Sequence, residues 1–314
     1  MNTGLLLDLE FCEHDTGDYH PEAPGRISAI HDKLTSSGLS ESCTQIEMRK
    51  ANDEEIILAH TKGYLEKVIT EIDGHMSNQL STGDTHFGIH SLEVARHAAG
   101  GLLNAVDGVV AGTFDNAFCA VRPPGHHATP DRGMGFCIFN NAAVAARYAQ
   151  KAHGLERVAI IDWDVHHGNG TQDIFYGDSS TFYFSTHQSP WYPGTGSKDE
   201  TGEGQGLGTT LNVPLPAGCG MEEIGAAFRG PFTEKMKDFK PDLVIISAGF
   251  DSRVDDPLGR FELTDKDFSQ LTTILMEMAG EFANGRLVSV LEGGYNQEGL
   301  AKAVASHVKA LQGS

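Results

Sequence analysis

A short apolar run that ends in alternating acidic and imidazole side chains constrains this chain most. Residues 157–170 read Arg-Val-Ala-Ile-Ile-Asp-Trp-Asp-Val-His-His-Gly-Asn-Gly. The uninterrupted apolar residues 158–161 indicate a strand buried on both faces, as in a parallel sheet covered by helices. Asp162, Asp164 and His166 follow at spacings of two, so an extended backbone places all three side chains on one face.

The Asp-x-Asp-x-His pattern makes a metal site the first hypothesis. Two carboxylates and an imidazole that converge at a strand end are a common set of metal ligands. The alternative is a polar strand end that binds nothing, because short motifs recur by chance. Gly168 and Gly170 follow directly, as expected where a chain leaves a sheet in a tight turn.

The composition is typical of an ordinary globular protein. Of the 314 residues, 39% are hydrophobic and 21% charged, and no apolar stretch approaches the roughly 18 residues of a membrane helix. The first residues lack the basic segment of a signal peptide, so we expect a cytoplasmic protein without a membrane partner. The five cysteines form no CxxC pair, which argues against a disulfide framework. The net charge of −20 disfavours nucleic-acid binding, because phosphate contacts need clusters of Lys and Arg.

Predicted strands and helices alternate from end to end. Strands are expected at 4–11, 117–122, 158–161, 181–187, 211–215, 243–251 and 287–292. Helices are expected from Arg26 onward, as one or two helices over 53–72, and at 91–110, 136–153, 221–239, 264–284 and 298–311. Within the helix at 91–110, Gly100 and Gly101 would allow close packing. The alternation predicts one α/β domain over residues 1–314, with an open, mostly parallel β-sheet flanked by helices.

Chemically active side chains gather just after four of the predicted strands. These positions are Gly125-His126-His127, Asp162 to His166, Asp251, and Gly293-Gly294-Tyr295. Open α/β sheets bind ligands beyond the carboxyl ends of their strands, so four loops can meet in one pocket.

Asp164, His166 and Asp251 are candidate metal ligands. Three protein ligands and an open position describe a catalytic rather than a structural zinc, although oxygen ligands also admit Fe(II) or Mn(II). Either His126 or His127 could take a proton from a bound water. Alone, the adjacent histidines could equally lie on the surface, and Asp251 could cap a loop.

Two further side chains could support this chemistry. Asp162 could orient a histidine through its ring N–H, and Tyr295 could stabilise an oxyanion by hydrogen bonding. On its own, Tyr295 fits simple packing as well. We expect His14 and His20, which lie in a proline-containing loop, to be capping or surface residues.

The most distinctive segments are Arg122-Pro-Pro-Gly-His-His-Ala128, Asp162-Trp-Asp-Val-His-His-Gly-Asn-Gly170, Ala248-Gly-Phe-Asp251 and Glu292-Gly-Gly-Tyr295. In combination they resemble the zinc-dependent histone deacetylases. More broadly, they are similar to the arginase–deacetylase superfamily, which includes bacterial histone deacetylase-like amidohydrolases and acetylpolyamine amidohydrolases. The match extends from His20-Pro21-Glu22 to Tyr295.

The resemblance implies a role for each matching residue. It implies zinc on Asp164, His166 and Asp251, with His127 as general base and acid and His126 paired to Asp162. Tyr295 would hydrogen-bond the substrate carbonyl. Phe136 and Tyr192 match the walls of an acyl-lysine tunnel, and Gly135 lies against it. Leu258 matches the rim of the tunnel, and Arg26 matches an internal cavity below the metal. Structural K⁺ or Na⁺ sites are implied around Asp162, Asp164, His166, Ser185 and Thr186, and around Phe175, Asp178 and Thr181.

Two positions refine the resemblance. Asn169 stands where class I enzymes carry aspartate, which is similar to class II. Tyr295 is kept, whereas the weakly active class IIa enzymes of vertebrates have histidine there. The chain is therefore expected to be an active deacetylase of acyl-lysine proteins, peptides or small acylated amines.

Alternative functions remain open. An acetylpolyamine amidohydrolase would need an acidic rim residue, which Leu258 does not supply but Glu22 or Asp84 could. A non-catalytic acyl-lysine binding module is disfavoured by Tyr295 and the histidine pair. A ureohydrolase would need a two-manganese site with more ligands. The oligomeric state is open, a homo-oligomer included.

Overall fold

The computed structural model describes residues 1–74 and 77–313. Its strands are β1 (Thr3–Leu7), β2 (Thr44–Gln45), β3 (Asn116–Ala120), β4 (Val158–Asp162), β5 (Thr181–Gln188), β6 (Thr210–Leu215), β7 (Leu243–Ala248) and β8 (Leu287–Leu291). Its α-helices are α1 (Gly25–Ser36), α2 (Asp53–Ile56), α3 (Lys62–Asp73), α4 (Ser91–Val110), α5 (Asn141–His153), α6 (Asn169–Phe175), α7 (Met221–Ala227), α8 (Thr233–Phe239), α9 (Asp265–Phe282) and α10 (Gln297–Leu311). Three short segments of other helix types are η1 (Leu9–Glu13), η2 (Gly204–Gly206) and η3 (Phe228–Phe232).

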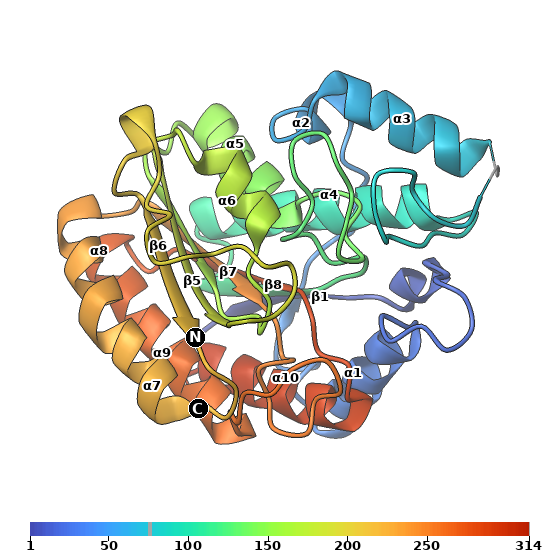
Figure 1. Ribbon diagram of the computed structural model, residues 1–314. Helices are drawn as coiled ribbons and strands as arrows, with labels where there is room; N and C mark the ends of the chain where they lie inside the picture. The colour runs from blue at the N-terminus through green and yellow to red at the C-terminus, as the bar shows by residue number, and fades with distance from the viewer. Residues whose placement is uncertain (75–76, 314) are drawn as a thin grey trace.

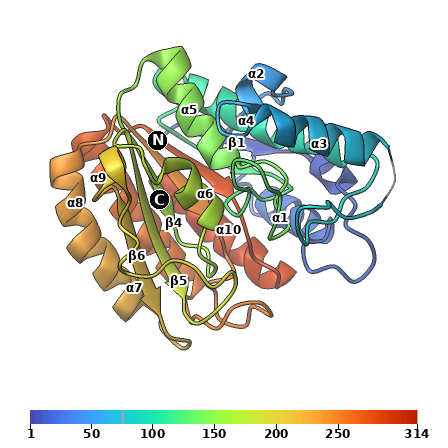
Figure 2. The ribbon, with the colours of Figure 1, turned by 45° about the horizontal axis from the view of Figure 1, so that its top comes forward.

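The strands form one sheet in the order β2-β1-β3-β8-β7-β4-β5-β6, and neighbouring strands pair in parallel. Helices α4, α5 and α6 lie on one side of the sheet, and α1, α7, α9 and α10 lie on the other (Figure 1). The same layers are visible in the rotated view of Figure 2. An open parallel sheet between two helical layers confirms the predicted fold class.

The central strand β4 is buried along its whole length, as its apolar sequence predicts. Ile160 is in register with Tyr183 of β5 on one side and with Ile245 of β7 on the other. A strand covered by helices on both faces must be apolar throughout, so its first polar side chains come only where it leaves the sheet. Among the described residues, no helix has the length and apolar character to cross a membrane.

Two predicted elements differ from the structure. The predicted strand at 4–11 ends at Leu7, because the Asp8 side chain accepts a hydrogen bond from the Glu10 amide, 2.8 Å away, and begins η1. The predicted helix at 221–239 is α7, a π-helical turn and α8, with Pro231 in the π-helical turn. Proline has no amide hydrogen for a helical bond, so the regular ladder is interrupted there. The short elements β2 and α6 were not predicted.

Gly100 lets α4 approach the segment before α2 closely. A Cβ at this position would overlap the carbonyl oxygen of Arg49 and lie 2.5 Å from the amide nitrogen of Ala51. Both atoms belong to the backbone, so neither can rotate away as a side chain would.

This contact predicts opposite effects for two glycine-to-alanine changes. Gly100→Ala should lower the free energy of unfolding by about 1–3 kcal/mol, because the added methyl group has no room. Gly280→Ala in α9, where no atom of the described residues lies within 4 Å of the new Cβ beyond the helix's own backbone and the chain neighbours, should raise it by about 0.5–1 kcal/mol through helix propensity. Equilibrium denaturation measures both values. A Gly100→Ala protein as stable as the Gly280→Ala protein would contradict the close contact.

Candidate metal centre and active site

Sheet order explains why distant segments meet at one site. Strands β3, β8, β7 and β4 are consecutive in the sheet. Because all pair in parallel, the loops that follow them leave from the same edge. Those loops carry all four of the predicted polar segments.

The three candidate ligands lie together at this edge. Suitable atoms of Asp164, His166 and Asp251 all lie within 4.8 Å of one another, and all three residues are buried. Nδ1 of His166 is 3.0 Å from Oδ1 of Asp164 and 3.2 Å from Oδ2 of Asp251. Oδ2 of Asp251 nevertheless accepts no hydrogen bond of acceptable geometry from residues 1–74 and 77–313.

Electrostatics at this cluster favours a bound cation. Burial and the nearby Asp164 carboxylate raise the pKa of Asp251 to about 7. Two buried carboxylates repel each other unless a positive charge lies between them. The cluster offers two carboxylates and one imidazole, and one carboxylate oxygen of Asp251 lacks a hydrogen bond within the described chain. This set of ligands therefore fits a divalent metal ion.

The histidine pair lies beside the cluster with both Nδ1 atoms held. Nδ1 of His126 is 3.0 Å from Oδ2 of Asp162, and Nδ1 of His127 is 2.8 Å from Oδ1 of Asn169. The Asn169 oxygen only accepts hydrogen bonds, so Nδ1 of His127 carries the hydrogen and its Nε2 keeps a free lone pair.

The two imidazoles have opposite protonation preferences. Burial alone would lower the pKa of His126, but the carboxylates of Asp162 and Asp164 raise it well above its usual value. Burial and the neighbouring His126 lower the pKa of His127 well below its usual value. A neutral His127 beside a protonated His126 is thus suited to accept a proton.

Tyr295 faces the same space from the loop after β8. Removal from water and the charge of Asp251 raise the pKa of Tyr295 well above its usual value, so the hydroxyl remains a donor. The Arg26 guanidinium lies 5.1 Å from the ring centroid, and its Nε donates to the Gly294 carbonyl at 2.7 Å. Arg26 thus supports both the backbone and the ring of the loop that carries Tyr295, here called the tyrosine loop.

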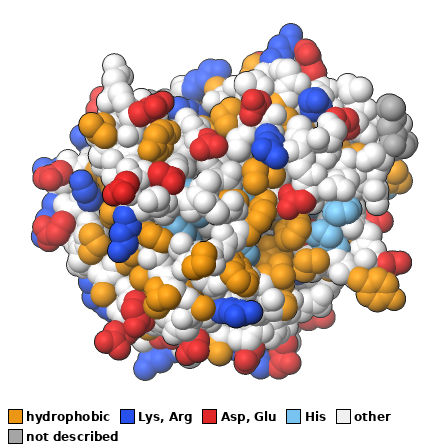
Figure 3. Space-filling view, viewed as in Figure 1, with side chains coloured by type: hydrophobic (Ala, Val, Ile, Leu, Met, Phe, Trp, Pro, Cys, Tyr) orange, Lys and Arg blue, Asp and Glu red, His pale blue; other side chains and the backbone are white. Residues whose placement is uncertain are grey.

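A cavity of about 260 Å³ leads to these groups. It is lined by Asp84, His127, Gly135, Phe136, His166, Trp191, Tyr192, Leu258 and Tyr295. All four predicted wall and rim residues are in this set. Hydrophobic side chains gather on this face of the molecule beside histidines (Figure 3). Gly135 has φ +58°, and a Cβ there would lie 2.6 Å from Cγ of His127, so only glycine fits.

Two lining residues were missed by the sequence analysis as wall residues. The amide of Gly135 donates to Oδ1 of Asp84 at 2.6 Å, and Trp191 Nε1 donates to the Leu258 carbonyl at 2.8 Å. Trp191 adjoins Tyr192 in the chain, which was a usable signal. Asp84 lies in a long polar loop whose path the sequence does not give.

The surface prediction for His14 is wrong. Its side chain is fully buried, 3.5 Å from Glu22, and burial together with Arg122 lowers its pKa to about 3. Glu22 is also fully buried and pairs with Arg122 and Arg26, so it is not available to receive a substrate amine. His20 is half-buried and lies edge-on to Phe136, with ring centroids 4.7 Å apart.

The predicted monovalent-cation residues lie on β4, α6 and β5 and in the segments that follow β4 and α6. Ser185 is in register with Asp162, and Oγ1 of the adjacent Thr186 is buried without a hydrogen-bond partner in the described chain. Phe175 ends α6 and Thr181 begins β5. Between them, Asp178 accepts a hydrogen bond from the Ser180 amide at 2.7 Å. The roles of these residues in binding K⁺ or Na⁺ stay predictions.

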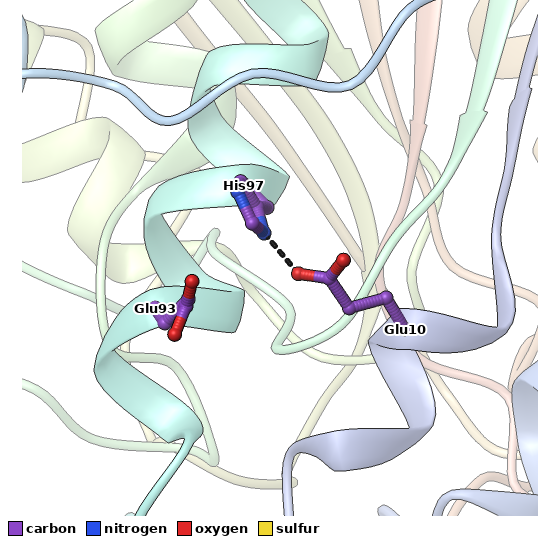
Figure 4. A group of neighbouring side chains, drawn as sticks. All are labelled: Glu10, Glu93 and His97. Atoms are coloured by element: carbon purple, nitrogen blue, oxygen red, sulfur yellow. Dashed lines mark ion pairs between the residues drawn. The ribbon is translucent and has the colours of Figure 1, made fainter.

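A second group of potential ligands lies near the surface. Glu10, Glu93 and His97 approach one another, with His97 paired to Glu10 (Figure 4). Glu93 also pairs with Lys50. Because both carboxylates have partners and are partly or fully exposed, we interpret this group as surface ion pairs.

The comparisons with known proteins agree on one family. Residues 20–311 match the histone deacetylase domain. The chain is 42% identical to histone deacetylase 10, chloroplastic, of Oryza sativa subsp. japonica, over 94% of this chain and 70% of that protein. It is 40% identical to the human polyamine deacetylase HDAC10, over 99% of this chain and 46% of that protein. Among solved structures, the HDA15 HD domain has a TM-score of 0.94 at 38% identity, covering 99% of this chain and 90% of that chain.

The geometry predicts which residues hold metal. Purified protein should contain about one tightly bound divalent ion per chain, and Asp251→Ala should lose it because a negative ligand is removed. Elemental analysis after dialysis measures the content. Glu93→Gln is the matched control, and it should keep the metal. Full metal content in Asp251→Ala, or loss in Glu93→Gln, would contradict the assignment.

Proposed function

We propose, since the chain belongs to the histone deacetylase domain family, that it is a zinc-dependent amidohydrolase that removes acetyl groups from lysine-like amines. The observation that carries the proposal is the arrangement of Asp164, His166 and Asp251 at the end of an apolar cavity beside His127 and Tyr295. The products are a free amine and a carboxylate.

Asp164, His166 and Asp251 would hold the metal ion. One imidazole and two carboxylates suit Zn²⁺, with Fe²⁺ as a second option. When bound, the ion supplies Lewis acidity toward the acyl carbonyl and lowers the pKa of water. K⁺ or Na⁺ would have a structural role behind the ligands, at the two sites that the resemblance implies.

His127 is the proposed general base and acid. Its free Nε2 takes a proton from the attacking water and later delivers it to the leaving amine. The Asn169 side chain accepts the hydrogen bond from Nδ1 of His127, so Nε2 of the same ring points away from Asn169. His126, paired with Asp162, keeps His127 neutral before the reaction because a second positive charge beside it is unfavourable.

Tyr295 is the proposed donor to the carbonyl oxygen. Negative charge builds on this oxygen as water adds to the carbonyl carbon. A donor that meets more charge in the transition state than in the ground state increases kcat. Phe136 and Tyr192 would enclose the aliphatic stem of the substrate and exclude water.

The wider setting is also part of the proposal. We infer one catalytic domain over residues 1–314 and a cytoplasmic location. The names of the relatives include a chloroplastic protein, and fluorescence microscopy of a tagged chain tests the location.

Replacing Tyr295 by phenylalanine tests the donor role. Tyr295→Phe keeps the ring and removes only the hydroxyl, so kcat on an acetyl-lysine peptide should fall by roughly 10²–10³. Metal content should not change, and KM should change much less than kcat. Tyr148→Phe, which removes a hydroxyl outside the cavity, should keep the wild-type kcat. A wild-type rate in Tyr295→Phe would make the tyrosine only a wall of the cavity.

Acetylpolyamine hydrolysis is a second candidate function. Asp84 places a carboxylate in the cavity lining, where it could attract a cationic amine, and the human relative is named a polyamine deacetylase. One carboxylate oxygen of Asp84 already accepts the Gly135 amide. The apolar Leu258 lies in the same lining, so we rank acyl-lysine first.

Substrate preference can be changed at Leu258. The wild-type protein should have a higher kcat/KM for an acetyl-lysine peptide than for acetylspermidine. Leu258→Glu should shift this ratio toward acetylspermidine by about tenfold, or ~1.4 kcal/mol, because the new carboxylate attracts the remaining ammonium groups. Leu207→Glu introduces the same charge on an exposed leucine outside the cavity and should leave the ratio unchanged. A tenfold preference of the wild type for acetylspermidine would reverse our ranking.

A further inference from the structure

The Asp256 carboxylate joins two loops of the cavity. Its Oδ2 accepts hydrogen bonds from the amides of Tyr295 at 2.7 Å and Asn296 at 3.2 Å. Its Oδ1 accepts the amide of Leu258 at 2.9 Å. Asp256 is buried, so these three bonds are shielded from water.

The tyrosine loop needs such an anchor. Gly293 and Gly294 precede Tyr295, and Gly294 has φ +121°, a conformation open mainly to glycine. Two glycines leave the direction of the following residue undetermined by local sterics. The amide of Gly293 donates to Oδ2 of Asp164 at 2.9 Å, but only Asp256 holds the Tyr295 amide itself among the bonds of the described chain.

The rim is anchored through the same carboxylate. Leu258 is held at its amide by Asp256 and at its carbonyl by Trp191 Nε1, 2.8 Å away. Leu258, Trp191 and Tyr295 all line the cavity. The proposed oxyanion donor and the rim are therefore fixed to one side chain.

We propose that Asp256 is a positioning residue that sets the Tyr295 hydroxyl and the Leu258 rim as one unit. The inference rests on the proposed function of Tyr295. A carboxylate is required because it accepts on both oxygens, whereas an amide offers one acceptor and one donor. In Asp256→Asn, the NH₂ group must face one of the backbone N–H groups. The repulsion between the two donors displaces the side chain, so both loops lose their fixed position.

The first test compares Asp256→Asn with Asp255→Asn. The second change removes the same charge from the adjacent, exposed residue and is the matched control. Asp256→Asn should lower kcat on an acetyl-lysine peptide by about 10- to 100-fold, because small displacements of a reacting group are costly. Metal content should stay at the wild-type level, and Asp255→Asn should retain the wild-type kcat.

A double-mutant cycle with Tyr295→Phe separates positioning from general damage. If Asp256 acts through the Tyr295 hydroxyl, Asp256→Asn has little left to disturb in a protein that already carries Tyr295→Phe. The double variant should then have a kcat within about twofold of that of Tyr295→Phe. A general structural defect would lower kcat by the same factor in both backgrounds. Additive losses would therefore overturn the proposal.

Tryptophan fluorescence gives a readout that does not need activity. The chain has two tryptophans, and Trp163 is fully buried, so acrylamide quenching reports on Trp191. Asp256→Asn should increase quenching because the Leu258 carbonyl is released, and Asp255→Asn should not. Unchanged quenching in Asp256→Asn would overturn the link to the rim. If the wild type hydrolyses no acyl-lysine, the proposed function fails, and this comparison still decides whether the anchor exists.

Discussion

The parallel pairing of β4 with β7 is the constraint on which the site depends. Asp162 at the end of β4 is in register with Ser247 of β7, and Asp251 follows four residues later. A one-residue slip would turn every side chain of β4 to the opposite face. The close packing of both strands against two helical layers opposes that slip, because each buried side chain would have to fit a space of a different shape. The hydrophobic core therefore determines the spacing of the polar groups.

Most of the fold was predictable from the sequence because apolar runs and turn residues repeat regularly. The helix predicted at 91–110 is α4, and most of the predicted strands are observed with shifts of a few residues. The end of β1 was not predictable, because a side-chain cap at Asp8 competes with strand extension. The break at Pro231 was missed although proline is a visible signal. These errors are local and do not alter the sheet.

The alternation of strands predicted the part of the site that lies at strand ends, whereas the loop residues of the cavity wall were predicted only through the family resemblance. Asp164 and Asp251 could be assigned to one edge because parallel strands share that edge. Asp84 and Trp191 enter the cavity from loops, and no periodicity describes loop paths. The burial of His14 was missed because it depends on the Glu22–Arg122 ion pair, in which residues a hundred positions apart compensate each other's charge. Such compensation is a property of the folded chain that no local pattern records.

The cavity wall has two origins, and this division bears on how such proteins diversify. His127, His166 and Tyr295 lie a few residues after strands from the middle of the sheet. Asp84 lies in the segment between α3 and α4, and Tyr192 lies at the start of the long segment between β5 and β6. Surface loops accept substitutions and length changes at little cost to the core. Random change can therefore alter which molecules enter the cavity while His127, His166 and Tyr295 keep their positions. Descendants of such a chain would be expected to differ first in the substrates that they accept and only later in the reaction that they catalyse.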